Sequence, residues 1–108
     1  MLKRVKHRYL GVEIDSEDAI SSGDFIDAVW KAILKLYGEY GASRTGLSLI
    51  DFNPEKKLGI IRTSQAAVEM VRAALASIIK IRDKPVAMHV LTVSGTIRAL
   101  YEKMEQRS

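Results

Sequence analysis

The sequence predicts a single α+β domain, and three observations support this. Short stretches in which apolar and polar residues alternate, as in strands, are interspersed with longer stretches whose apolar residues recur at helical spacing. These stretches follow the order strand, helix, strand, strand, helix, strand, and a further helix comes last. Nothing within the 108 residues is long or polar enough to be a linker, so we expect one domain over residues 1–108.

The first strand and the first helix are predicted from the opening third of the chain. Residues 1–6 are basic, and we expect them to form a flexible arm. Apolar and other residues alternate over Tyr9–Ile14, which predicts a strand. After an acidic loop, Ser21 and Asp24 resemble a capping box at the start of a helix. We expect this helix to end within Gly38–Gly41, because glycine adopts the left-handed backbone of helix ends.

A hairpin, a second helix and a last strand are predicted from the rest. Leu47–Phe52 and Leu58–Thr63 are strand-like, and the turn-forming residues 53–57 between them predict a hairpin. The alanine-rich stretch Gln65–Ile81 is the clearest helix in the sequence. Val86–Val93 predicts the last strand.

The predicted order of elements is that of two split βαβ units, which is the ferredoxin-like or RRM-like sandwich. In this fold two helices cover one face of a four-stranded antiparallel sheet. Right-handed crossovers place the four strands in the spatial order 4-1-3-2. The last helix, beginning near Ile97, is an addition to this fold.

Composition excludes several classes of protein and favours one kind of ligand. The formal net charge of +4 and the pI near 9.5 favour an acidic partner, most commonly nucleic acid. Absence of cysteine excludes disulfides and thiolate metal sites, and the two histidines lack metal-ligand spacing. We therefore expect no cofactor and no metal on this chain. No spanning helix or signal peptide is apparent, and we expect a cytoplasmic protein.

The predicted topology gathers positive groups at one edge of the sheet. Where the third and fourth strands end and the first begins, basic and hydroxyl-bearing residues of four segments should meet. This set consists of Lys6, Arg8, Arg44, Arg62, Thr63, Ser94, Gly95, Thr96 and Arg98. Helix starts and clustered cations are what a phosphate backbone requires, so we expect this edge to bind RNA or DNA. Ser94 and Thr96 are also good helix caps, and a simple helix start is the commoner explanation for them.

The face of the sheet away from the two helices is unusually apolar. A sheet with one face in water should alternate more cleanly than these strands do. We expect the last helix to cover part of this face and a partner protein to cover the rest. The candidate interface residues are Ile50, Phe52, Ile61, Leu91, Leu100 and Tyr101. Because Tyr9 is the only aromatic residue on the first and third strands, we do not expect bases to stack on the sheet.

Three segments together carry a resemblance to a known family. Leu36-Tyr37-Gly38-Glu39-Tyr40-Gly41, Gly59-Ile60-Ile61-Arg62-Thr63 and Val93-Ser94-Gly95-Thr96-Ile97-Arg98 occur in this order and spacing. In this the chain resembles protein component 2 of archaeal ribonuclease P, a family shared with the Pop-type subunits of ribonuclease P and MRP. The resemblance runs from about Arg8 to Tyr101.

The resemblance implies a noncatalytic subunit of the ribonucleoprotein that matures the 5′ ends of transfer RNA. The ribonuclease P RNA would carry the Mg²⁺-dependent cleavage, and precursor tRNA would be contacted indirectly. It also implies pairing with the TIM-barrel-type protein subunit of that enzyme, with self-association in a two-plus-two assembly. Matching the motifs supports Arg62, Ser94, Thr96 and Arg98 as RNA-facing residues.

Two other functions fit the residues less well. An acyl-phosphate hydrolase of this fold needs a glycine-rich loop with an arginine after the first strand, where this chain has the acidic segment 15–18. His89 could be a general base, but it lies in an apolar strand with no carboxylate near it in sequence. A small-molecule regulatory module would explain the apolar face but not the basic edge.

Overall fold

The computed structural model describes residues 6–107, with side chains through Gln106, so the expected arm lies outside the described residues except for Lys6. Four antiparallel strands form the central sheet in the order β2-β3-β1-β6. They are β1 (His7–Asp15), β2 (Ser48–Asn53), β3 (Leu58–Ser64) and β6 (Ala87–Ser94). Since β6 is the fourth predicted strand, the predicted order 4-1-3-2 is confirmed.

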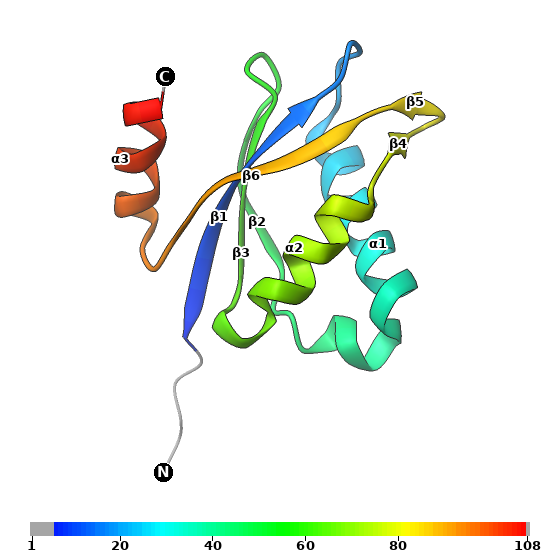
Figure 1. Ribbon diagram of the computed structural model, residues 1–108, viewed down its shortest axis with the longest axis horizontal. Helices are drawn as coiled ribbons and strands as arrows, with labels where there is room; N and C mark the ends of the chain where they lie inside the picture. The colour runs from blue at the N-terminus through cyan, green and yellow to red at the C-terminus, as the bar shows by residue number, and fades with distance from the viewer. Residues whose placement is uncertain (1–5, 108) are drawn as a thin grey trace.

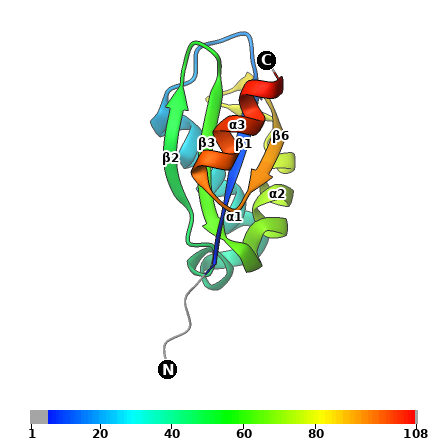
Figure 2. The same cartoon turned by 90° about the vertical axis from the view of Figure 1, so that its left-hand side faces the viewer.

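The helices lie on opposite sides of this sheet. Helices α1 (Ser22–Ser43) and α2 (Val68–Ser77) cover one face, as Figure 1 shows. Helix α3 (Ile97–Arg107) lies against the other face, in front of the sheet in Figure 2. The chain is therefore a ferredoxin-like α+β fold with an added C-terminal helix, as predicted. Among the described residues, no helix is both long and apolar enough to cross a membrane.

Helix α1 begins and breaks at residues that the sequence identified. The Ser21 side-chain oxygen accepts a 3.1 Å hydrogen bond from the Asp24 backbone N–H, which caps the helix. Gly38 interrupts the helix with φ 72° and ψ −178°. The chain then resumes helical geometry through Ser43, so the predicted end at Gly38–Gly41 is a break followed by one more turn.

The predicted hairpin of β2 and β3 is confirmed, and a β-bulge distorts it. Asn53 Oδ1 accepts hydrogen bonds from the backbone N–H groups of Glu55 and Lys56, which shapes the turn. The register between the two strands shifts between Leu49 and Asp51. Ile50 is thus the extra residue of the bulge.

The predicted helix over Gln65–Ile81 is wrong at both ends. It begins with the 3₁₀ turn η1 (Gln65–Ala67), and α2 ends at Ser77. A small hairpin follows, made of β4 (Lys80–Ile81) and β5 (Lys84–Pro85). Its two turn residues, Arg82 and Asp83, both have positive φ, and the residue before a proline is disfavoured in a helix.

The main hydrophobic core lies between the sheet and helices α1 and α2. Leu10, Val12 and Ile14 of β1 point into it and are at most 2% exposed. Phe25 of α1 stacks on Phe52 of β2 with 5.4 Å between ring centroids. Gly59 makes room for this pair, because a Cβ there would lie 2.6 Å from the Phe25 ring.

A second, smaller core lies between the sheet and α3. Leu100 of α3 is fully buried and Ile60 is 4% exposed, yet neither belongs to the main core. The Met104 sulfur fills the space that a side chain at Gly11 would need, since a Cβ there would lie 2.8 Å from it. The expectation that the last helix covers part of the apolar sheet face is confirmed.

Candidate nucleic-acid interface

Four segments meet at one end of the sheet, and we call this end the rim. The rim consists of Lys6–Tyr9, Arg44–Thr45, Arg62–Gln65 and Ser94–Arg98, and it is the lower end of the sheet in Figure 1. On one side of β1, pairing with β3 places His7 opposite Ser64, and on the other side, pairing with β6 places Tyr9 opposite Ser94. The Gln65 N–H donates a 2.8 Å hydrogen bond to the Lys6 carbonyl. The backbones of the segments predicted to converge do lie together.

Hydroxyl groups hold the rim together from inside. Thr63 is fully buried, and its hydroxyl donates a 2.6 Å hydrogen bond to the Thr45 carbonyl. The Ser64 hydroxyl donates a 3.2 Å hydrogen bond to the Arg44 carbonyl. Ser94 is 6% exposed. Thr63 and Ser94, both predicted to face RNA, therefore offer almost no surface to a ligand.

Arg8 and Arg62 lie on opposite faces of the sheet. Arg8 pairs with Thr63 across the β1–β3 ladder, while Arg62 pairs with Tyr9. Because successive strand residues point to opposite faces, Arg62 faces the α3 side of the sheet and Arg8 faces the α1 and α2 side. Arg8 also reaches the turn before α3, where its Nη1 lies 3.3 Å from the place a Cβ on Gly95 would occupy.

Two buried nitrogen atoms without a hydrogen-bond partner lie on the α3 face of the rim. They are His7 Nδ1 and Arg62 Nε, and among the described residues no other buried side-chain nitrogen or oxygen lacks one. The two residues share a face, because His7 pairs with Ser64, two positions beyond Arg62. Buried polar atoms are normally hydrogen-bonded, so this corner of the rim has unused hydrogen-bonding capacity.

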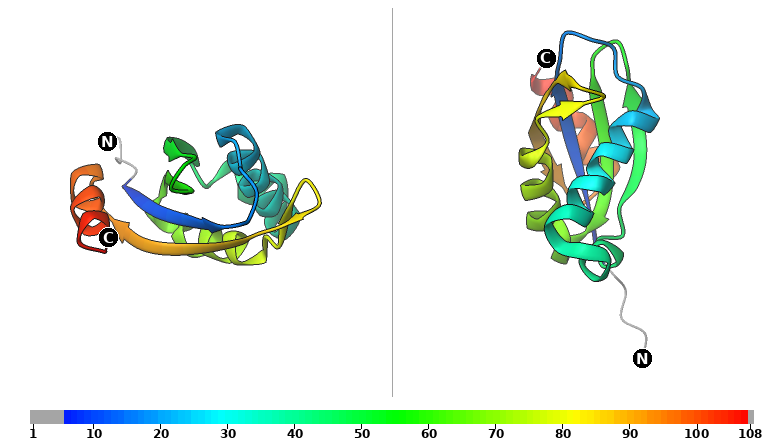
Figure 3. Two further views of the ribbon diagram at one scale, coloured as in Figure 1. Left: turned by 90° about the horizontal axis from the view of Figure 1, so that it is seen from above. Right: turned by 90° about the vertical axis from the view of Figure 1, so that its right-hand side faces the viewer.

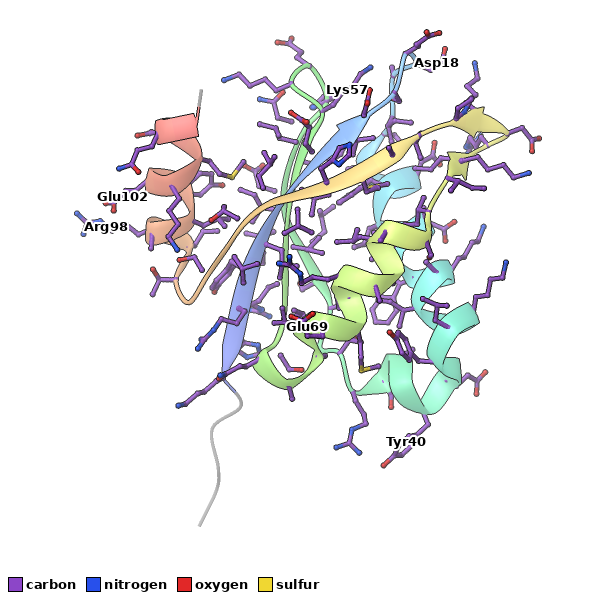
Figure 4. The ribbon with its side chains drawn as sticks, viewed as in Figure 1. Asp18, Tyr40, Lys57, Glu69, Arg98 and Glu102 are labelled. Carbon is purple, nitrogen blue, oxygen red and sulfur yellow. The ribbon has the colours of Figure 1, made fainter. Side chains whose placement is uncertain are left out.

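The remaining cations of the rim point in other directions. Arg98 extends from the side of α3 that faces away from the sheet, as Figure 4 shows, and pairs with Glu102 at 3.5 Å. Arg44 lies over the Tyr40 ring, 5.4 Å from its centroid, and donates a 2.7 Å hydrogen bond to the Tyr40 hydroxyl. The cations of the four segments thus surround the rim instead of forming one continuous surface.

The turn before α3 is a capped helix start. The Thr96 side-chain oxygen accepts a 3.1 Å hydrogen bond from the Ala99 N–H and so satisfies one free donor of the first turn. This is the commoner of the two explanations that the sequence offered. Gly95 and Thr96 remain exposed, and Gly95 lies beside Arg8.

The residues predicted to contact a partner protein divide into two groups. Ile61 and Leu100 are fully buried within the chain, and Phe52 packs on Phe25 on the helix side of the sheet, so these three are occupied by the fold itself. Ile50 is 38% exposed, Tyr101 is 41% exposed, and Leu91 is partly exposed on β6.

Tyr101 joins α3 to the edge strand β2. Its hydroxyl donates a 2.9 Å hydrogen bond to Asp51 Oδ2. Partial burial, this hydrogen bond and the negative charge of Asp51 all raise the pKa of the Tyr101 hydroxyl above 10.0.

The helix side of the molecule carries apolar surface outside the predicted partner interface. Large apolar side chains are exposed on α1 and just after α2: Leu34, Leu36, Tyr37, Tyr40 and Ile79. Leu36 and Tyr40 lie off the apolar stripe of α1, which is the one signal that could have identified them. Ile79 fitted the stripe of a helix that ends before it.

Acidic side chains lie at the other end of β1. Asp15 is the last residue of that strand, and Glu17 and Asp18 follow it. Asp18 pairs with Lys84 at 3.3 Å, and Lys57 donates a hydrogen bond to the Ser16 carbonyl. Within the described part of the chain, no three histidine, aspartate or glutamate side chains are placed to hold a metal ion.

Comparison with known proteins identifies relatives of this sequence. The profile of the Rpp14/Pop5 family matches residues 8–105. Ribonuclease P protein component 2 of Methanosarcina mazei is 36% identical over 103 residues, covering 95% of this chain and 87% of the relative. The protein of the same name from Pyrococcus horikoshii is 35% identical, covering 93% of this chain and 83% of the relative.

A solved structure shares the fold. A chain in the cryo-EM structure of yeast ribonuclease MRP superposes with a TM-score of 0.72 over 99% of this chain and 97% of that one. The sequence identity is 17%, so this likeness concerns the fold alone.

Proposed function

Because the chain belongs to the Rpp14/Pop5 family, we propose that it is a noncatalytic protein subunit of ribonuclease P. In this role it binds the catalytic RNA and supports the Mg²⁺-dependent removal of 5′ leaders from precursor tRNA. The rim is the observation that carries the RNA-binding part of the proposal, because it is where basic side chains of four segments surround one end of the sheet.

Arg8 and Arg62 suggest how the RNA lies. They flank the rim from the two faces of the sheet, with exposed Lys6 beside them. A phosphate backbone that crosses the end of the sheet meets both arginines, whereas one that lies flat on either face meets only one of them. The unpartnered Nε of Arg62 would find its acceptor in a phosphate oxygen after a small side-chain adjustment.

The sheet face contributes little to reading bases in this proposal. Helix α3 lies against that face, and the only aromatic side chains on β1 and β3 are His7 and Tyr9, both at the start of β1. RNA-binding sheets of this topology stack bases on aromatic residues of those two strands. The chain would therefore recognise the shape and backbone of its RNA.

We place the chemistry on the RNA. Mg²⁺ would be bound by the RNA, since the acidic segment of the chain, Asp15–Asp18, lies at the end of β1 opposite the rim. Precursor tRNA would be engaged through the assembled particle. As the relatives are archaeal proteins, we place this chain in the cytoplasm.

We further propose that the chain pairs with the TIM-barrel-type protein subunit of the enzyme in a two-plus-two assembly. The exposed part of the α3 side, with Ile50, Leu91 and Tyr101, supports an apolar contact there. Asp51, which accepts a hydrogen bond from the Tyr101 hydroxyl, lies at the edge of this apolar surface.

Reconstitution tests the proposal. Catalytic RNA, precursor tRNA and the partner protein subunits are mixed with and without this chain, and the rate of leader removal is measured at limiting Mg²⁺. The proposal expects faster cleavage with the chain and retention of the RNA that falls steeply with salt. Unchanged cleavage together with weak retention that salt screens completely would contradict it and favour a small-molecule regulatory module.

A further inference from the structure

We propose that a groove on the helix side of the molecule binds an acidic amphipathic helix of a partner protein. The groove runs between α1 and residues 77–82, which follow α2, and has a volume of about 770 Å³. It is lined by elements that lie on the opposite side of the sheet from α3, as the right-hand view of Figure 3 shows. We call it the α1 groove.

The β4–β5 hairpin forms one wall of the α1 groove. Helix α2 ends at Ser77, and the chain then turns so that the hairpin lies beside α1. Arg82 Nε pairs with Asp24 Oδ2 at 3.0 Å and so ties the tip of the hairpin to the first turn of α1. The tip of the hairpin is therefore in contact with α1.

Apolar side chains line the α1 groove and are left open to solvent. Ile79 is 73% exposed, although its neighbours Ile78 and Ile81 are at most 8% exposed. Leu36 is 48% exposed at the far end of the groove on α1. Covering these two side chains would remove apolar surface from water without rearranging the fold.

Two alanines on α1 allow close approach. Ala28 and Ala32 line the groove one helical turn apart, and both are only half-buried. Small residues at this spacing let a second helix approach the first closely. From Asp24 to Leu36 the groove follows about 18 Å of α1, the length of a helix of about 12 residues.

The charge of the α1 groove favours an acidic occupant. Four basic and two acidic side chains line it: Lys31, Lys35, Lys80, Arg82, Asp24 and Asp27. Both acids are already paired, Asp24 with Arg82 and Asp27 with Lys31 at 2.9 Å. Among the described residues Lys35 forms no ion pair, and Lys80 pairs only with Asp83, at 3.9 Å and with both side chains exposed. An acidic partner can therefore approach both lysines.

Other occupants fit this surface less well. A nucleic acid would gain from the lysines but would leave Ile79 and Leu36 without apolar contacts. A second copy of the chain in a two-fold contact would bring two grooves of the same net positive charge together, and like charges in an interface are unfavourable. An acidic helix with apolar anchors matches both features of the groove.

Three fluorescein-labelled peptides of about 15 residues, a length at which an isolated helix begins to form, test the proposal against the intact chain. The first has leucines at helical spacing with glutamates beside them. The second replaces its glutamates with lysines, and the third keeps the glutamates but replaces its leucines with glutamines. Fluorescence anisotropy should show the first peptide binding at least about tenfold more tightly than either of the others.

Matched variants locate the binding. Ile79→Asp should weaken binding of the first peptide by about tenfold or more, while Tyr40→Asp, at an equally exposed aromatic outside the groove, should not. The double variant Lys35→Glu with Lys80→Glu should also weaken binding of the first peptide by about tenfold or more. Lys56→Glu, on the turn of the β2–β3 hairpin and outside the groove, should not weaken it. Circular dichroism checks that each variant is folded.

Several outcomes would overturn the proposal. They are equal binding of the acidic and basic peptides, equal binding of the peptide without leucines, or no binding of any peptide. Concentration-dependent dimerisation that Ile79→Asp abolishes would assign the groove to a second copy, and weaker RNA binding by Ile79→Asp would assign it to RNA. Because the peptide assay contains no RNA, its result is independent of the proposed ribonuclease P function.

Discussion

The Tyr101 hydroxyl donates a 2.9 Å hydrogen bond to Asp51 Oδ2 and so joins α3 to β2, the edge strand of the sheet. Since the pKa of Tyr101 is raised, ionisation of its hydroxyl is less favourable in the folded chain than in the unfolded one. The stability from this contact is therefore fully present below pH 10 and is lost as the pH rises through the folded-state pKa.

Tyr101→Phe tests this contact. We expect the free energy of unfolding to fall by less than about 1 kcal/mol at neutral pH, because the pair is exposed. The difference from the parent chain should shrink as the pH rises above 10, which urea titrations at several pH values would measure. A difference that stays constant to high pH would contradict the assignment.

Gly59→Ala and Gly11→Ala should differ in their effect on stability. A Cβ at Gly59 meets the buried Phe25 ring, whereas one at Gly11 meets the end of the flexible Met104 side chain. We expect Gly59→Ala to cost about 1–3 kcal/mol by overpacking, and Gly11→Ala to cost clearly less. Thermal unfolding of both variants measures this, and equal losses would show that α3 cannot adjust.

Gly38→Ala should destabilise the chain although space is available for the methyl group. The backbone there has φ 72° and ψ −178°, a region that is almost restricted to glycine. The free energy of unfolding should fall by about 1–3 kcal/mol. Gly38→Asn should cost about as much as Gly38→Ala, because this region excludes asparagine too. Gly23→Ala, in the first turn of α1 with an open Cβ position, is the control and should be neutral or stabilising.

Removing the two arginines that flank the rim should weaken RNA binding in a salt-dependent manner. The slope of log affinity against log salt should become shallower by about 1.4 to 1.8 in Arg8→Ala with Arg62→Ala, if each contacts one phosphate. Filter binding at several salt concentrations measures the slope. Lys31→Ala with Lys56→Ala removes the same charge elsewhere and should leave it unchanged.

Two further variants separate a lost contact from a lost fold. Lys6→Ala changes an exposed residue of the rim and should make the slope of log affinity against log salt shallower by less than about 1. Thr63→Val removes the buried hydrogen bond to the Thr45 carbonyl, so it should cost about 1 kcal/mol of stability without changing the slope. A smaller slope in Thr63→Val than in the parent would contradict its structural role.

The four strands of the central sheet, their order and the presence of the two helices that cover it could be predicted from the sequence because one physical rule governs them. Leu10, Val12 and Ile14 alternate, and Phe25, Val29 and Ile33 recur every four residues, because each set has one face to bury. Right-handed crossovers then leave a single strand order.

The β4–β5 hairpin escaped prediction because its residues satisfy the same rule. Ile78 and Ile81 are three apart and both are buried, as in a helix, although the backbone between them is extended. The competing signals were local, namely Pro85 and the two turn residues before Lys84. Local turn chemistry decided the structure there.

The rim could be predicted as a meeting of backbones but not as an arrangement of side chains. Topology determines which segments end together, and this was sufficient to bring Arg8, Arg62 and Ser94 to one place. Strand register determines which side chains share a face, and a shift of one residue reverses it. The pairing of Arg8 with Thr63 could not be obtained from one sequence.

The contact between Met104 and Gly11 has a consequence for synthesis of the chain. The ribosome synthesises β1 long before α3, so the α3 side of the sheet is exposed to solvent until residues 97–107 have been made. During that interval Ile60 has no cover, and nascent chains with such surfaces are prone to aggregate. The α3 side of the sheet can therefore be covered by the chain itself only after translation has passed every strand.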